Sequence, residues 1–176
     1  MKRMFARTWP RVAGGALCAL LIAQVVLAGG RKEHPYRHSE VDIPVSLAVG
    51  TVRTPEFPVI GQWYDIMIQV EKPLPLVRMQ CMMGVTSGLR DPKDCSSNDP
   101  LLRADWTVFD SGRVVDRGTT PTRCACKFES KYIYKFLGSF AGEAGKSYVV
   151  EVKFTNDGTP LNVANPHLIV IRHRKN

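Results

Sequence analysis

The chain has 176 residues, which is enough for one domain with its own hydrophobic core. Its formal net charge is +8, and it contains five cysteines. The sequence has no basic-aromatic motif of the kind that binds nucleic acid, so we do not expect nucleic acid as a partner.

The first 28 residues have the pattern of a secretory signal peptide. The segment opens with four basic residues, Lys2, Arg3, Arg7 and Arg11. An apolar run then ends in Val26-Leu27-Ala28, a small-residue cleavage pattern. We predict export to the periplasm with cleavage after Ala28, and taking the four basic residues from +8 leaves a formal charge of +4. The alternative is an uncleaved segment that anchors the protein in the membrane, which would be its only contact with a bilayer.

Residues 29–40 are polar and are predicted to form a flexible arm ahead of a domain that spans residues 41–176. Within this domain, short apolar stretches are separated by turn residues, and no helical periodicity is apparent. Pro44 confines the first predicted strand to an edge or a bulge. The predicted strands cover residues 43–49, 63–71, 76–83, 104–109, 113–116, 132–140, 148–154 and 167–174.

The segment from Phe140 to Phe154 is central to the fold prediction. It reads as a strand end, a glycine-containing corner and a strand of strict alternation that begins at Tyr148. A tyrosine that opens a strand after such a corner is typical of immunoglobulin-like sandwiches, where its hydroxyl ties the corner back to the chain. We therefore predict an all-β, immunoglobulin-like antiparallel sandwich of seven to eight strands, with Trp106 as a core anchor.

Cleavage of the signal would leave four cysteines, and an even number in an exported domain predicts two disulfide bonds. They are Cys81, Cys95, Cys124 and Cys126. A bond between Cys124 and Cys126 is excluded because both side chains point the same way from an extended strand. The two remaining pairings join Cys81 and Cys95 to the Cys124–Cys126 segment, and both stay open.

Motifs of catalysis are lacking in the sequence. We find no G-x-S-x-G elbow, no H-E-x-x-H helix, no glycine-rich phosphate loop and no C-x-x-C redox motif. We therefore expect a protein that is not an enzyme and needs no cofactor. An alternative is a soft-metal site for Cu(I), because thioethers are soft ligands. Its ligands would be Met79, Met82 and Met83, with Met67, Cys81, His34 and His38 as neighbouring donors.

Three apolar side chains are predicted to point outward from otherwise polar strand faces, namely Met67, Met82 and Val149. Such a patch is typical of an interaction surface. We therefore predict an exported, non-catalytic protein that binds a protein or an envelope component. Immunity to a secreted antibacterial effector is the sharpest version of this function, by analogy with periplasmic proteins of similar size.

The order of four segments, 64–70, 136–140, 145–152 and 165–170, resembles that of small exported proteins of Gram-negative bacteria grouped as a domain of unknown function. The segments read Tyr64-Asp-Ile-Met-Ile-Gln-Val70, Phe136-Leu-Gly-Ser-Phe140, Gly145-Lys-Ser-Tyr-Val-Val-Glu-Val152 and Asn165-Pro-His-Leu-Ile-Val170. The resemblance implies an immunoglobulin-like β-sandwich for most of the mature chain. It implies no activity.

Overall fold

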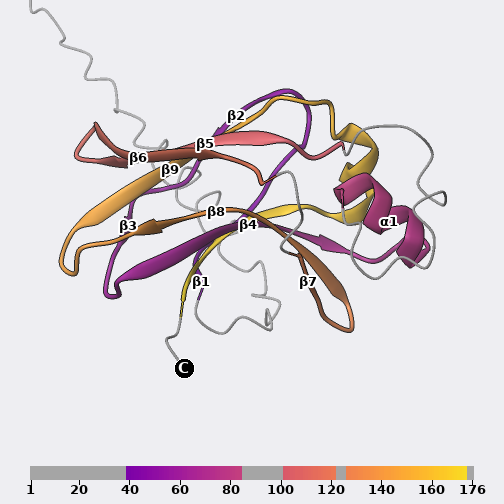
Figure 1. Cartoon of the computed structure of the whole chain (residues 1–176), viewed down its shortest axis with the longest axis horizontal. Helices are drawn as coiled ribbons and strands as arrows, with labels where there is room; N and C mark the ends of the chain where they lie inside the picture. Colours follow the sequence, from indigo (N-terminus) through magenta and orange to yellow (C-terminus); the bar gives the residue numbers. More distant parts are fainter. Residues whose placement is uncertain (1–38, 85–100, 122–125, 174–176) are drawn as a thin grey trace, which may run out of the picture. The chain divides into compact units, whose positions relative to one another are not determined.

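The computed structural model describes residues 39–84, 101–121 and 126–173, and these form two antiparallel sheets packed face to face (Figure 1). The predicted signal peptide, nearly all of the arm, Cys95 and Cys124 lie outside the described residues. No helix in the described ranges is long and apolar enough to cross a bilayer. The predicted β-sandwich is confirmed, although its described part has ten strands rather than seven or eight.

The first sheet, sheet A, has the strand order β1-β10-β4-β8-β7. Its long central pair, β4 and β8, is antiparallel and contains a bulge beside Ile66. Strand β1 lies at one edge of the sheet and ends at Pro44. Proline has no N–H to donate to a neighbouring strand, so this edge position agrees with the prediction. The bounds are β1 Ser39–Pro44, β10 His167–Arg172, β4 Trp63–Glu71, β8 Tyr132–Ala141 and β7 Cys126–Phe128.

The second sheet, sheet B, has the order β2-β9-β5-β6, and β3 also pairs with β9. Thr54 joins β2 to β3 along the same edge of β9. Its N–H donates to the Val150 carbonyl at 2.9 Å, and its Oγ1 accepts from the Val150 N–H at 2.9 Å. The Thr54 hydroxyl thus takes the place of a backbone carbonyl as the acceptor for the Val150 N–H. The bounds are β2 Gly50–Arg53, β3 Phe57–Pro58, β9 Ser147–Phe154, β5 Ala104–Asp110 and β6 Arg113–Thr119.

The hydrophobic core lies between the two sheets and follows the alternation in the sequence. Every second residue of β4 from Tyr64 and of β9 from Tyr148, four in each strand, is buried there. They are Tyr64, Ile66, Ile68 and Val70 from β4, and Tyr148, Val150, Val152 and Phe154 from β9. Strand β10 contributes Leu168 and Val170 to this core and turns Ile169 and Ile171 to the other side of sheet A.

Trp106 links the two sheets near the centre of the sandwich. Its Nε1 donates to the Leu137 carbonyl of β8 at 3.1 Å, while Trp106 itself belongs to β5. The indole occupies the space beside Gly118 of β6 and Gly138 of β8, where a Cβ on either residue would collide with the ring. The predicted core anchor is confirmed, and two glycines leave room for it.

Two tyrosine hydroxyls fasten turns at the same end of the sandwich. The Tyr148 hydroxyl accepts from the Glu143 N–H at 3.2 Å, which confirms the predicted tie across the glycine corner. The Tyr64 hydroxyl accepts from the N–H groups of Ile60 and Gly61, both at 2.9 Å. Phe140 lies between the two rings, with centroids 5.4 Å from Tyr64 and 5.8 Å from Tyr148.

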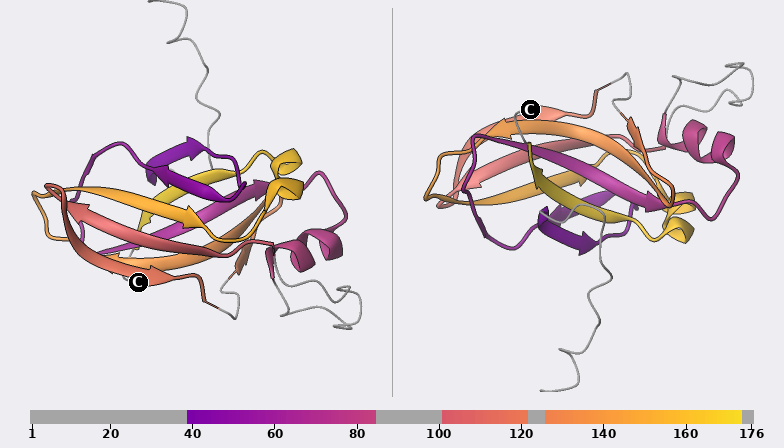
Figure 2. Two further views of the ribbon diagram at one scale, coloured as in Figure 1. Left: turned by 90° about the horizontal axis from the view of Figure 1, so that it is seen from above. Right: turned by 90° about the horizontal axis from the view of Figure 1, so that it is seen from below.

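The segment Leu76–Met83 is an α-helix, α1, and the strand predicted there is wrong. Pro75 precedes the first turn, and Gly84 ends the helix with a left-handed φ of 73°. Met79 and Met83, four residues apart, share the buried face. Residues 77–81 alternate between apolar and polar side chains at a period of two, which favoured the strand prediction. Helix α1 lies at the same end of the sandwich as the 3-10 helix η2 (Thr159–Ala164), as Figure 2 shows.

Two other predicted boundaries are corrected by the structure. The first strand was predicted over residues 43–49, but β1 ends at Pro44 and Val49 is 63% exposed. The hairpin strand predicted over residues 113–116 continues to Thr119. The turn before it has positive φ at both Ser111 (50°) and Gly112 (79°), which suits a tight hairpin.

Candidate functional site: the outer face of sheet B

An in-register row of apolar side chains crosses the outer face of sheet B. In β5, Phe109 is opposite Val149 of β9 on one side and opposite Val114 of β6 on the other. Residues directly opposite each other in an antiparallel pair share a face, and Val108 and Val150 next to them point into the core. The row of Phe109, Val149 and Val114, hereafter the apolar row, therefore points away from the core.

The apolar row is accessible to a partner. Val114 is 56% exposed, and Phe109 and Val149 are half-buried. Val115, next in β6, is 49% exposed. Single exposed apolar residues are common on protein surfaces, but adjacent ones that occupy three neighbouring strands form a continuous patch, which is typical of interaction sites.

Charged side chains surround the apolar row in an ordered way. The Arg53 guanidinium carbon lies 4.9 Å from the centroid of the Phe109 ring, in a cation–π contact. The Arg53 Nε is also 3.5 Å from Glu151 Oε2, so this carboxylate already has a cationic partner. Arg117 and Lys153 are exposed, and neither side chain has an ion pair with the part of the chain that the structure describes.

The hairpin end beside the apolar row carries a small ion-pair network. Lys146 Nζ is 3.2 Å from Asp110 Oδ2 and 2.9 Å from Glu143 Oε2. Hydrogen bonds from Lys146 and Ser111 lower the pKa of Asp110, and hydrogen bonds to Glu143 and Asp110 raise the pKa of Lys146. These three charges satisfy one another, which leaves Arg113, Arg117 and Lys153 as the exposed cations near the apolar row that have no ion pair with the described residues.

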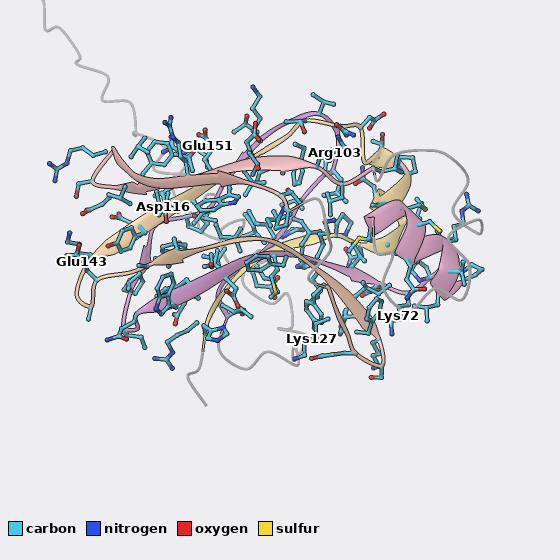
Figure 3. All side chains as sticks on the ribbon, in the orientation of Figure 1. Lys72, Arg103, Asp116, Lys127, Glu143 and Glu151 are labelled. Carbon is cyan, nitrogen blue, oxygen red and sulfur yellow. The ribbon has the colours of Figure 1, made fainter. Side chains whose placement is uncertain are left out.

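Two lysines at the α1 end of the molecule interact with Glu129 and so connect neighbouring segments of the chain. Lys72 donates to the Glu129 carbonyl, and Lys127 Nζ lies 2.9 Å from Glu129 Oε1. Figure 3 shows Lys72 and Lys127 near α1 and β7, whereas Asp116 and Glu143 lie toward the opposite end. The candidate surface on sheet B is therefore separate from this structural cluster.

Of the three residues predicted to bind a partner, only Val149 lies in the apolar row. Met67 lies on the outer face of sheet A, where it packs beside Tyr134 and Ile169. Tyr134 is 0% exposed and Ile169 is 2% exposed, so this face of sheet A is buried around them. Met82 is half-buried on α1 and packs against the main core. The structure does not bring the three residues together.

The proposed metal ligands Met79 and Met83 are both fully buried among apolar side chains of the core. In the described ranges, no group of three or more His, Cys, Asp or Glu side chains is arranged to hold a metal ion. His34 and His38 lie outside the described residues. The two remaining histidines each face an acid, with His167 Nδ1 2.6 Å from Asp42 Oδ1 and His173 Nδ1 3.3 Å from Asp65 Oδ2.

Cys81 is in a disulfide bond. The described side chains do not include its partner, because Cys95, Cys124 and the side chain of Cys126 lie outside them. The two pairings left open by the sequence therefore stay predictions.

Lys135 is a buried charge that the sequence prediction missed. It follows the core residue Ile133 at a spacing of two in β8 and is 2% exposed. Its Nζ donates to the Met83 carbonyl at 2.8 Å, so it caps the last turn of α1. Burial lowers the pKa of Lys135 to about 8, and the charge of Arg103 adds to this shift. Period-two alternation alone would have placed Lys135 on the core face.

Phe109 and Val114 were also missed as members of a site. Trp106 was predicted as a core anchor, and a period of two then places Phe109, three residues later, on the outer face, so alternation contained this signal. The register that brings Val114 and Val149 to either side of it was not available from the sequence, because β5 and β9 are about forty residues apart.

Comparisons with known proteins identify the fold only. No protein-family model and no curated protein matches the sequence. The structure resembles the crystal structure of an uncharacterised protein from Sulfurospirillum deleyianum, with a TM-score of 0.54 and 9% sequence identity. The match covers 77% of this chain and 98% of the other. At this identity the likeness supports a shared β-sandwich architecture.

Proposed function

We propose that the protein is an exported, non-catalytic binding protein that recognises a protein or envelope partner through the outer face of sheet B. The observation that carries this proposal is the apolar row of Phe109, Val149 and Val114 in register across three strands. Val114 is 56% exposed, so the apolar row leaves apolar surface in contact with water that a partner would bury. An immunoglobulin-like topology, the signal peptide and a periplasmic location are parts of the same proposal.

Immunity to a secreted antibacterial effector is the sharpest form of the proposed function. A stapled β-sandwich with a rigid, patterned face suits such a role, because preorganised surfaces bind with little loss of conformational entropy. The cation–π contact of Arg53 with Phe109 favours the observed orientation of the central side chain of the row. This form predicts a single protein partner with a fixed stoichiometry.

The test is an affinity capture with three versions of the tagged full chain, expressed in Gram-negative bacteria. They are the wild type, a Val114→Lys/Val149→Lys variant and a Val163→Lys control. Val163 is 67% exposed in η2, outside sheet B, so this control changes charge without touching the apolar row. Bound proteins from envelope and secreted fractions are identified by mass spectrometry, which also locates the N-terminus of the exported chain.

We expect one stoichiometric partner that is captured by the wild type and the Val163→Lys control and lost by the double variant. Equal capture by all three versions would place the interface elsewhere and refute the proposed site. If no specific partner appears with the wild type, the proposal of a protein ligand is wrong.

A further inference from the structure

The edge strand β6 combines three features that specify a ligand. It is the last strand of sheet B, and among the described strands only β5 pairs with it. It carries Val114 and Val115, which are 56% and 49% exposed. Arg113 and Arg117 flank these valines, and both are exposed. An edge strand presents free N–H and C=O groups to which an extended segment can add as a further strand.

We propose that β6 binds an extended acidic-apolar segment of the partner protein by strand addition. This inference rests on the proposed function and names the chemistry of the partner. Arg113 pairs with Asp110 and Arg117 with Thr107, so the bulge between them places the two arginines on opposite faces of β6. Carboxylates on the two faces of the added strand would form cross-strand ion pairs with them, and an apolar residue would cover Val114. The apolar row continues from β6 across β5 to β9, so side chains of the added strand extend an existing apolar surface.

A second copy of the same chain fits this edge poorly. An antiparallel β6–β6 pair centred on Val115 would place Arg113 opposite Arg117, and a pair centred on Asp116 would place this acid opposite itself. Like charges directly opposite each other destabilise a strand pair. An acidic strand instead meets Arg113 and Arg117 with charges of opposite sign.

A bulge in β6 makes the edge selective. Phe109 of β5 pairs with Val114, and Val108 pairs with Asp116, so Val115 is the extra residue in β6. Bulges and charged residues both discourage indiscriminate pairing at sheet edges. The ladder of the added strand is therefore interrupted at Val115, and ion pairs with the two arginines become a larger part of the binding energy.

The test uses decapeptides on an array, incubated with the full chain. Each decapeptide has a background of alternating valine and threonine. Two positions three residues apart, which lie on opposite faces of an extended strand, carry glutamates in one set, lysines in a second set and glutamines in a third. A fourth set has the acidic sequence with a central proline, which removes a ladder donor. The variants are Arg113→Glu/Arg117→Glu and the control Arg172→Glu, a charge reversal in β10 of the other sheet.

We expect the wild type and the Arg172→Glu control to bind the acidic set about tenfold or more tightly than the lysine set. The Arg113→Glu/Arg117→Glu variant should reverse this order, and proline should abolish binding. Hydrogen exchange with the tightest acidic peptide should protect amides within residues 113–119. Failure of the acidic set to bind, or the same preference in the charge-reversed variant, would overturn strand addition.

The two proposals fail in different ways. If no acidic peptide binds but the Val114→Lys/Val149→Lys variant still loses a captured partner, strand addition at β6 is wrong and the binding face stands. If the peptides bind as expected but this variant keeps every captured partner, the peptide site is real and the proposed function of the apolar row is wrong.

Discussion

Lys135 is the residue whose replacement gives the sharpest physical prediction, because it is a cation enclosed in the core. It is 2% exposed, and its pKa falls from an ordinary value of 10.5 to about 8 in the folded chain. The protonated form is therefore less favourable in the folded state than in the unfolded state. This penalty is fully present below pH 8 and disappears above pH 10.5.

The sign of the pH dependence follows from proton binding. Between pH 8 and pH 10.5 the unfolded chain binds more protons at Lys135 than the folded chain, so stability rises with pH. From pH 7 to pH 9.5 the two pKa values predict a gain of about 2 kcal/mol from this residue alone. Replacement by methionine, which has a similar length and no charge, should remove this gain.

The assay is urea unfolding of the wild type, Lys135→Met and the exposed control Lys153→Met at pH 7, 8, 9 and 9.5. The difference between the wild type and Lys135→Met should change by about 2 kcal/mol over this range, which is about 1 M in the urea midpoint. The Lys153→Met control should follow the wild type. Parallel pH profiles for the wild type and Lys135→Met would refute the assignment of Lys135 as a buried cation.

Other replacements test the hydrogen bonds, the packing and the disulfide bond that stabilise the fold. Tyr64→Phe leaves two N–H groups without their acceptor and Tyr148→Phe leaves one, so in thermal unfolding Tyr64→Phe should cost more, about 2 against about 1 kcal/mol. Equal losses would contradict this ranking. Gly138→Ala forces a Cβ against the Trp106 indole and should cost about 1–3 kcal/mol in urea unfolding, whereas a stability like that of the wild type would show that the space is adaptable. Cys81→Ser should lower stability by about 2–4 kcal/mol, with a smaller further loss on adding reductant than in the wild type. A melting temperature equal to that of the wild type would exclude a stabilising role for this bond.

The parts of the fold that could be predicted are the strands in which apolar and polar residues alternate without interruption. The alternation in β4 and β9 fixed the core face of both strands, and the Tyr148 corner was recognised from one glycine segment. Helix α1 was missed because residues 77–81 alternate in polarity, although Met79 and Met83 lie four residues apart. Its boundary residues, Pro75 and Gly84, contained the missing signal, since proline before a helix and glycine after it are helix punctuation.

The candidate site was less predictable, because it depends on pairing between distant strands. Alternation showed that Val149 and Met67 both point away from the core, but it did not show that they belong to different sheets. Phe109 gains its importance from its neighbours in register, and a register between β5 and β9 is set by the whole sheet. Lys135 was overlooked because a lysine in a strand is normally assigned to the solvent face, whereas here the carbonyl end of α1 supplies an acceptor.

The position of Trp106 has a practical consequence for following the molecule in solution. Its indole is 7% exposed and bridges β5 to β8, whereas Trp63 at the start of β4 is 46% exposed. A shielded indole emits at shorter wavelengths than one in water, so of these two residues Trp106 should emit farther to the blue. Separation of the two sheets would expose Trp106 to water and shift its emission to the red. Intrinsic tryptophan fluorescence therefore reports whether the two sheets remain packed together.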